Sequence, residues 1–262
     1  MRVIGREKGV NEMSGIIVVK IGGVAGSHLH ENFFKQIKTW QADGKQVVLV
    51  HGGGVQISKM MEALQIPVET KAGLRITTKE TLAVTKMVLI GQVQPEIVTA
   101  LEQQDISAVG LHAGDAGLMQ AEQLTDGELG FVGEITHVKT DLIESLIAQQ
   151  IVPVIAPLGL AMSTQWLNVN ADLAACAVAA ALQAEELILL TDVAGVLNAG
   201  EVVSHIDTAE LDDLFATEII TGGMIPKLKS AKNAVTQGVG QVIITNEMTA
   251  KGTIISEGVK IG

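Results

Sequence analysis

The sequence predicts an α/β fold, namely a three-layer α/β/α sandwich with a mainly parallel central sheet. Short apolar runs alternate along the chain with segments of helical periodicity, an order typical of parallel strands joined by helices. The apolar fraction is 47% but aromatic residues make up only 2%, so the core must consist mainly of aliphatic side chains, as in buried parallel sheets. The 262 residues suffice for one large domain or two lobes.

The elements follow from these runs and from their helix caps. The expected strands are Ile16–Lys20, Val47–Val50, Ala108–Leu111, Ile151–Ala156, Leu187–Leu190 and Gln241–Thr245. The expected helices are Glu31–Asp43, Val55–Leu64, Thr78–Gly91, Pro95–Gln104, Asp141–Gln149, Asp172–Gln183, Thr208–Phe215 and Ile225–Gln237. Thr77 and Glu80 have the spacing of a capping box, and Pro95 suits the first turn of a new helix. The stretch 117–139 lacks helical periodicity and is expected to form a β-hairpin.

Charge and cysteine content limit the partners. The net charge of −11 argues against nucleic acid and anionic membranes, although a few local lysines could still bind a nucleotide. The single cysteine, Cys176, excludes a disulfide within the chain, fits the cytoplasm, and in its alanine-rich surroundings is expected to be a small buried residue. No stretch is long and apolar enough to predict a membrane helix, and residues 1–13 are expected to be a flexible tail without a signal-peptide pattern.

Two glycine-rich turns directly follow two expected strands. Lys20 precedes Gly22 and Gly23, and His51 precedes the triplet Gly52–Gly54, after which a helical pattern begins at once. Glycines let a ligand approach the bare backbone, and a helix start offers unpaired N–H groups, so such turns favour a phosphate. Glycine turns also occur for packing, and the sequence contains neither a P-loop nor a dinucleotide-binding fingerprint.

Three further segments strengthen the functional interpretation. Asn168, Asn170 and Asp172 alternate before an alanine-rich helix, where a single polar residue would suffice as a cap. The strand that ends at Leu190 is followed by another polar turn. Lys227 lies in the first turn of a helix, where a cation opposes the helix dipole, which disfavours its reading as a merely solvated charge.

These segments resemble the amino acid kinase family over nearly the whole chain, from Ile16 to the last strands. The resemblance rests on Lys20-Ile21-Gly22-Gly23, on His51 with Gly52–Gly54, on Gly73-Leu74-Arg75, on Asn168-Val169-Asn170-Ala171-Asp172, on Thr191-Asp192-Val193, and on Gly222-Gly223-Met224-Ile225-Pro226-Lys227. Within the family, the motifs are most similar to those of members that phosphorylate N-acetyl-L-glutamate. The Gly73 and Asn168 motifs are the most specific, whereas carbamate, aspartate and uridylate kinases share the glycine clusters.

The resemblance implies that ATP phosphorylates the side-chain carboxylate of N-acetyl-L-glutamate, an early step of arginine biosynthesis. Lys20 and Lys227 would stabilise the transferring phosphoryl group, and Asp172 would hold both lysines. The acyl amino acid would be bound by Gly53, Gly54, Arg75, Asn168 and Asn170, and the phosphates by a cradle of Gly22, Gly23 and Gly52. ATP would contact Thr191, Asp192, Val193, Ala194, Gly195, Val196, Leu197, Ile219, Ile220 and Thr221. Mg²⁺ would enter with ATP, without a dedicated cluster of metal ligands.

The resemblance also implies an N-terminal lobe, residues 14–172, for the acyl amino acid and dimerisation, and a C-terminal lobe, residues 173–262, for ATP. The apolar residues of Thr78–Gly91 are too widely spread for one face, so this helix is either buried in the core or a two-fold dimer contact. Residues 1–14 offer too little for the N-terminal helix that links arginine-inhibited members into hexamers. We therefore expect a homodimer that arginine does not inhibit.

Two other functions stay open at this point. A sister kinase for another carboxylate, such as N-acetyl-aminoadipate, would share the lysines and glycines but differ around Gly73–Arg75 and Asn168. A non-catalytic ligand sensor on the same fold would lack at least one of Lys20, Asp172 and Lys227, and the sequence retains all three.

Overall fold

The computed structural model describes residues 15–22, 29–71, 73–124, 127–198, 200–216 and 224–258. The predicted tail, residues 1–13, lies outside the described residues. The same holds for four predicted site residues, Gly23, Ile219, Ile220 and Thr221.

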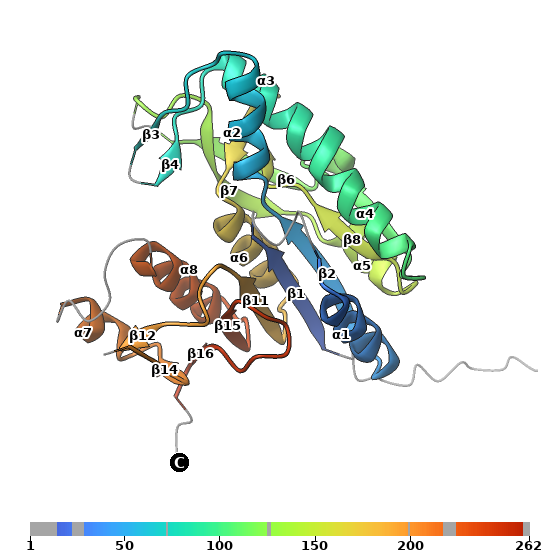
Figure 1. The fold of residues 1–262 in the computed structure, drawn as a ribbon, viewed down its shortest axis with the longest axis vertical. Helices are drawn as coiled ribbons and strands as arrows, with labels where there is room; N and C mark the ends of the chain where they lie inside the picture. Colours follow the sequence, from blue (N-terminus) through green and yellow to red (C-terminus); the bar gives the residue numbers. More distant parts are fainter. Residues whose placement is uncertain are drawn as a thin grey trace, which may run out of the picture.

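An eight-stranded sheet forms the centre of the molecule (Figure 1). Its strand order is β14 (His205–Asp207), β16 (Thr253–Ser256), β15 (Gln241–Thr245), β11 (Glu186–Leu190), β1 (Ile16–Ile21), β2 (Gln46–His51), β8 (Val152–Ile155) and β5 (Ala108–Leu111). Neighbouring strands are parallel except for β15 and β16, which are antiparallel. The predicted mainly parallel sheet is therefore confirmed, with all six expected strands in place.

Helices cover both faces of this sheet. Along β1, Ile17 and Val19 pack on one side with α1 (Glu31–Ala42), α2 (Gly54–Ala63), α3 (Lys79–Val88) and α4 (Gln94–Glu102). Ile16 and Val18 pack on the other side with α5 (Asp141–Ile147), α6 (Ala171–Ala181) and α8 (Met224–Thr236). The short helix α7 (Leu211–Ala216) contacts α8. Alternate side chains of a strand point to opposite faces, so a continuous apolar run fills two cores, and the three-layer sandwich is confirmed.

The strands outside this sheet form a small barrel and two hairpins. The expected hairpin in 117–139 is present as the antiparallel strands β6 (Met119–Gln123) and β7 (Val132–Val138). These two strands close a four-stranded barrel with β9 (Leu158–Leu160) and β10 (Trp166–Val169), which the sequence analysis did not predict. Two further hairpins of two-residue strands pair β3 (Thr70–Lys71) with β4 (Leu74–Arg75), and β12 (Leu197–Asn198) with β13 (Glu201–Val202).

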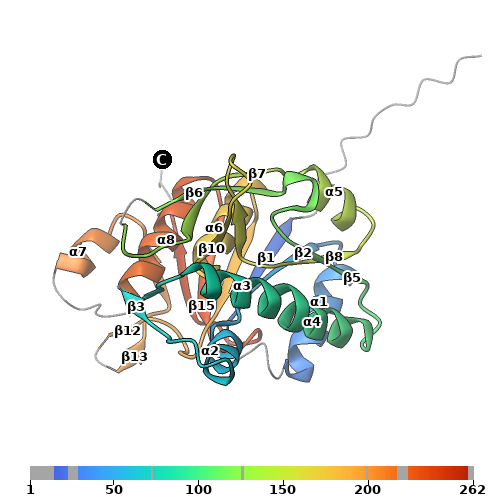
Figure 2. The ribbon, with the colours of Figure 1, turned by 90° about the horizontal axis from the view of Figure 1, so that it is seen from above.

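The predicted separation of two helices near Gly91 is wrong. A π-helical turn, Leu89–Val93, joins α3 directly to α4, and Figure 2 shows the two as one helical run. Pro95 lacks an N–H and cannot close an ordinary helical hydrogen bond, and the wider π turn just before it lets the helix continue. Proline therefore marks a change of helical pitch here, without an intervening loop.

The predicted capping box is also wrong by one residue. Thr78, not Thr77, caps α3, because its Oγ1 accepts from the N–H of Thr81 at 3.2 Å. Thr77 is fully buried in an extended segment and forms a bridge to Gly130. Its hydroxyl is directed to the site described below.

The two halves of the chain share the central sheet. Strands β1, β2, β5 and β8 come from the N-terminal half, and β11, β14, β15 and β16 come from the C-terminal half. The halves meet where β1 pairs with β11, and Figure 1 shows the C-terminal strands, in orange and red, gathered on one side of this junction. Within the described residues, no helix combines the length and apolar character needed to cross a membrane.

Candidate active site

The carboxyl ends of β1 and β2 open into a cavity of about 440 Å³. Parallel strands end at the same edge of a sheet, which is where α/β proteins bind ligands. Most of the predicted catalytic and substrate residues that the structure describes converge on this one place. The lining includes Lys20, Gly52, Gly53, Gly54, Val55, Ile57, Thr70, Gly73, Arg75, Leu89, Pro157, Asn168, Val169, Asn170, Ala171 and Asp172.

Lys20, Asp172 and Lys227 form one charged cluster. Lys20 Nζ lies 2.8 Å from Asp172 Oδ1, and Lys227 Nζ donates to Asp172 Oδ2 at 2.5 Å. Lys20 comes from the end of β1, Asp172 from the first turn of α6 and Lys227 from the first turn of α8. The structure thus unites two lysines from opposite halves of the chain on one carboxylate.

The cluster keeps its charges although it is mostly buried. Burial alone would raise the pKa of Asp172, but the ammonium groups of Lys20 and Lys227 outweigh this and hold it below its ordinary value. The side chains of Lys20 and Asp172 are 9% and 13% exposed, so water screens them little. Two cations around one anion leave a local positive charge beside the cavity.

The start of α2 offers unpaired N–H groups to the same cavity. Gly53 precedes the helix, no side chain caps it, and its first turn holds no acidic residue. A Cβ built at Gly54 would meet nothing within 4 Å, so this glycine borders open space. At Gly53 a side chain is excluded for a different reason, because an added Cβ would lie 2.6 Å from Leu89 Cδ2 of the π turn. Gly22 is likewise required, since its Cβ would lie 2.8 Å from the carbonyl oxygen of Leu190.

Arg75 presents its guanidinium at the edge of the cavity. Its Nη2 donates to Ser58 Oγ at 2.8 Å and to the carbonyl oxygen of Gly54 at 3.0 Å, while Nη1 contacts the sulfur of Met61. No carboxylate among the described residues pairs with it. Burial lowers the pKa of Arg75 from its ordinary value, but an arginine remains charged in proteins. A charged fork held by neutral partners is suited to an anionic ligand.

The three alternating polar residues have three different partners. Asn168 Nδ2 donates to Thr77 Oγ1 at 3.1 Å. Asn170 caps α6, because its Oδ1 accepts from the N–H groups of Asp172 and Leu173. Asp172 holds the two lysines. Asn170 has the ordinary role of a helix cap and also lines the cavity.

The predicted ATP segment starts at the end of β11, beside β1. Thr191 Oγ1 donates to Asp192 Oδ1 at 2.9 Å and, with the more distant ammonium groups of Lys227 and Lys20, lowers the pKa of Asp192. Val196 is buried, and its N–H donates to Thr253 Oγ1 at 2.8 Å, so its side chain belongs to the core. None of the described residues 191–197 lines the cavity itself. Their contact with ATP therefore stays a prediction.

His51 and Cys176 are both buried. His51 Nδ1 lies 2.9 Å from the carbonyl oxygen of Gly52 and donates to it, since a carbonyl can only accept. Burial lowers the pKa of His51 to about 4, so the ring is neutral at pH 7. Burial and the charge of Asp172 raise the pKa of Cys176 to about 12, which confirms the interpretation of this residue as a small buried side chain.

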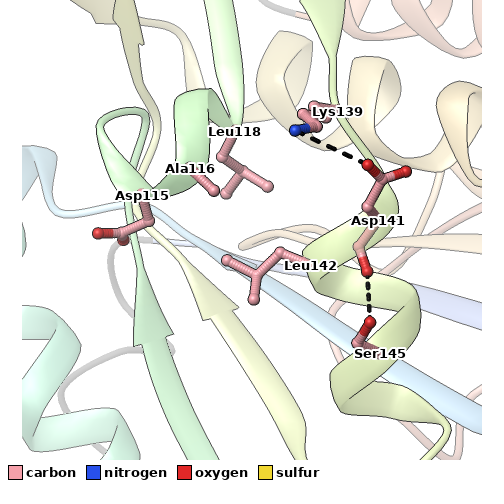
Figure 3. A pocket seen from close by; sticks show the side chains of 7 residues that line it. All are labelled: Asp115, Ala116, Leu118, Lys139, Asp141, Leu142 and Ser145. Carbon is pink, nitrogen blue, oxygen red and sulfur yellow. Dashed lines mark hydrogen bonds and ion pairs between the residues drawn. The ribbon is translucent and has the colours of Figure 1, made fainter.

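A second cavity, of about 250 Å³, lies between the short helical turn Asp115–Gly117 and the start of α5 and contains none of the predicted site residues (Figure 3). Its charged groups already have partners. Asp115 accepts from the N–H of His112 at 2.7 Å, and Lys139 lies 3.7 Å from the exposed Asp141. Arg75 and Lys20 line the first cavity instead, and Lys227 is paired there with the lining residue Asp172.

Two features of the site were not predicted from the sequence, namely the hydrogen bond of Thr77 with Asn168 and the apolar wall formed by Leu89 and Pro157. Thr77 follows Arg75 by two positions, and the period of two in extended chain places both on one side. That spacing was a usable signal. Leu89 lines the cavity from the π turn, which no sequence pattern indicated.

Comparison with known proteins identifies the family of the chain. The family model described as "Amino acid kinase family" matches residues 15–246. A curated protein named acetylglutamate kinase, from Listeria monocytogenes serovar 1/2a, is 59% identical over 250 residues, 95% of this chain and 100% of its own length.

Solved structures agree in fold. The crystal structure of smu.665 from Streptococcus mutans UA159 superimposes with a TM-score of 0.86 and 40% identity, covering 93% of this chain and 99% of that one. Carbamate kinase from Giardia lamblia, bound to AMP-PNP, superimposes with a TM-score of 0.67 and 18% identity over 94% of this chain and 99% of that one. At that identity the second likeness concerns the fold alone.

Proposed function

The chain belongs to the amino acid kinase family, and from this premise we propose that it transfers the γ-phosphoryl group of ATP to the side-chain carboxylate of N-acetyl-L-glutamate. The product would be an acyl phosphate, and the reaction an early step of arginine biosynthesis. The observation that carries the proposal is the ion-pair cluster of Lys20, Asp172 and Lys227 at a cavity that also holds Arg75, which pairs with no carboxylate of the described residues.

The cluster has the charges that phosphoryl transfer requires. Negative charge spreads over the transferring oxygens, so catalysis depends on positioned cations more than on covalent help. Lys20 and Lys227 supply two such cations, and Asp172 holds both in place. Asp172 need not act as a base, because a glutamate-like acceptor with a pKa of about 4.3 is already ionised at pH 7.

The acceptor would be bound at the opposite wall. Arg75 can take its α-carboxylate through two parallel N–H bonds, a geometry that a lysine cannot reproduce. Asn168 lines the cavity next to it and offers polar atoms to the acylated amine. The N–H groups at the start of α2, around Gly53 and Gly54, would face the reacting oxygens.

The nucleotide would lie on the C-terminal side, over residues 191–197 and 219–221, with Gly22, Gly23 and Gly52 at its phosphates. No group of three or more His, Cys, Asp or Glu residues within the described part of the chain could hold a metal ion. Mg²⁺ would be bound through the phosphates of ATP, where it would neutralise their charge.

We propose further that residues 14–172 and 173–262 act as acceptor and ATP lobes of a cytoplasmic homodimer. Helix α3 is not buried all round, because Met87 is 57% exposed, and at the neighbouring α2 Met60 is 37% exposed and the C-cap residue Leu64 is 51% exposed. Large apolar side chains exposed on adjacent helices suit a self-complementary two-fold contact.

A substrate panel tests the function directly. The purified protein is given ATP and, in turn, N-acetyl-L-glutamate, N-acetyl-L-aminoadipate, L-glutamate and L-aspartate, and ADP release is measured. Hydroxylamine traps any acyl phosphate as a hydroxamate. We expect the highest kcat/KM with N-acetyl-L-glutamate. Faster turnover of another acceptor would identify a sister kinase, and binding without ADP release would identify a sensor.

A further inference from the structure

One buried hydroxyl links the two residues that form the acceptor wall. Thr77 Oγ1 donates to the carbonyl oxygen of Arg75 at 2.9 Å and accepts from Asn168 Nδ2 at 3.1 Å. Thr77 is fully buried and does not itself line the cavity. Arg75 and Asn168 belong to β4 and β10, two strands that are far apart along the chain, so this hydroxyl connects two remote elements directly.

Along the sequence, Asn168 follows Arg75 by 93 positions, and Thr77 brings them together.

The donors and acceptors at Thr77 fix the orientation of the Asn168 amide. A carbonyl oxygen can only accept, so Thr77 must donate its single proton to Arg75. Towards Asn168 the hydroxyl can then only accept, which requires the amide nitrogen to face Thr77 and turns Oδ1 away. No described residue donates a hydrogen bond to this Oδ1. Asn168 therefore keeps an acceptor oxygen available at the cavity.

We infer that Thr77 is a positioning residue for the acceptor, because it holds Asn168 so that Oδ1 can accept from a ligand N–H. This inference rests on the proposed function and deepens it. An N-acylated amino acid has one amide N–H beside its α-carboxylate, which matches an acceptor oxygen at Asn168 beside the guanidinium of Arg75. If the amide could rotate by half a turn, it would present a donor to that N–H instead.

Main-chain hydrogen bonds hold the backbone around Thr77 independently of its hydroxyl. The N–H of Thr77 donates to the carbonyl of Leu129 at 2.9 Å, and the N–H of Phe131 donates to the carbonyl of Thr77 at 2.8 Å. The N–H of Asn168 donates in turn to the carbonyl of Phe131 at 2.9 Å. These main-chain bonds remain when the hydroxyl is replaced by a methyl group of the same size. Loss of the hydroxyl should therefore affect the orientation of Asn168 more than the fold.

The test compares Thr77→Val, which removes the hydroxyl, with Thr77→Ser, which keeps it. Thr85→Val is the matched control, since Thr85 is also fully buried but its hydroxyl has no hydrogen-bond partner among the described residues. Loss of one positioning hydrogen bond should raise the KM for N-acetyl-L-glutamate roughly tenfold in Thr77→Val. The KM for ATP should not change, Thr77→Ser should restore the wild-type KM, and Thr85→Val should leave both constants unchanged.

A wild-type KM for the acceptor in Thr77→Val would overturn the inference, and so would an equal rise in the KM for ATP. Thr77→Ala provides the same readout if the valine variant does not fold. A second check is made in the Asn168→Ala background, where Thr77→Val should cause no further rise in KM. Absence of turnover by the wild-type protein would refute the proposed function instead. Calorimetric binding of N-acetyl-L-glutamate to the same variants would then still test the role of Thr77.

Discussion

Asp172 and Lys227 form an ion pair at 2.5 Å although 55 positions separate them in the sequence. Asp172 lies in the first turn of α6, where the helix dipole favours an anion, whereas Lys227 lies in the first turn of α8, where the dipole disfavours a cation. The carboxylate offsets that unfavourable position. The lysine is thus held beside the cavity by its partner and not by its own helix.

Removing either lysine should impair the chemical step. Lys227→Ala and Lys20→Ala should each lower kcat by roughly 10²- to 10³-fold, because a positioned charge is lost from the transferring phosphoryl group. Lys232→Ala is the control, since Lys232 lies on the same helix as Lys227 but pairs with the exposed Asp212. Steady-state kinetics with saturating ATP and acceptor measure the effect. Near-normal kcat in the Lys227 variant would remove it from the mechanism.

Asp172→Asn should also lower kcat, by about a hundredfold, although the substituted side chain contacts no transferring atom in the proposed mechanism. The two ammonium groups would lose the carboxylate that holds them and would repel each other. Asp212→Asn breaks an exposed ion pair at 2.7 Å and should leave kcat unchanged. Equal kcat values for the two variants would contradict the positioning role of Asp172.

Arg75→Lys should act on the acceptor alone. We expect the KM for N-acetyl-L-glutamate to rise about ten- to a hundredfold, because a lysine cannot form two parallel bonds to a carboxylate. The KM for ATP should stay near its wild-type value. A variant that loses affinity for ATP and not for the acceptor would show that the two pockets have been assigned the wrong way round.

The buried His51 should make the folded protein sensitive to mild acid. Its pKa is about 4 in the folded protein and 6.5 in the unfolded chain, so the unfolded chain takes up the proton first as the pH falls. The contribution of His51 is therefore complete above pH 6.5 and declines towards pH 4, by about 3 kcal/mol in total. Urea unfolding at several pH values measures this slope.

His51→Gln should remove most of that slope between pH 6.5 and pH 4, whatever its effect on stability at neutral pH. His137→Gln is the control, because His137 is exposed on β7 and should leave the slope in place. An unchanged slope in the His51 variant would assign the pH dependence to other groups.

Assembly of the proposed dimer can be tested separately from catalysis. Met87→Glu should convert a dimer to a monomer in light scattering, because it places a charge on the exposed apolar side of α3. Val202→Glu, on β13 of the C-terminal half, should leave the dimer intact. Arginine should not inhibit the wild-type enzyme. A hexamer that millimolar arginine inhibits would contradict both expectations.

Those parts of the fold whose signals are local could be predicted from the sequence. Continuous apolar runs such as Ile16–Lys20 can only be buried on both faces, and the Gly52–Gly54 triplet marks an abrupt passage from strand to helix. Strands β9 and β10 were missed because their three and four residues are stabilised by pairing across the barrel. The π turn was missed because Pro95 usually signals the start of a separate helix.

The candidate site likewise has a part that local motifs predict and a part that depends on tertiary structure. The residues that carry charge or lack a side chain were recognisable from motifs, and the described members of the catalytic and acceptor sets gather at the cavity. The spacing of Arg75 and Thr77 was a local signal, but the role of Thr77 also depends on the amide of Asn168, which lies 91 positions away in the sequence. Partners of a buried hydroxyl follow from tertiary structure alone.

The gathering of Lys20, Arg75 and Lys227 in a chain of net charge −11 has a consequence for ionic strength. Anionic substrates meet an overall repulsive field and are attracted only close to the cavity, since charges are screened over about 8 Å at physiological salt. Moderate salt weakens the long-range repulsion first, while the partly buried cations keep most of their effect. Added salt should therefore not slow the encounter with ATP, unlike in enzymes that steer their substrates by long-range attraction.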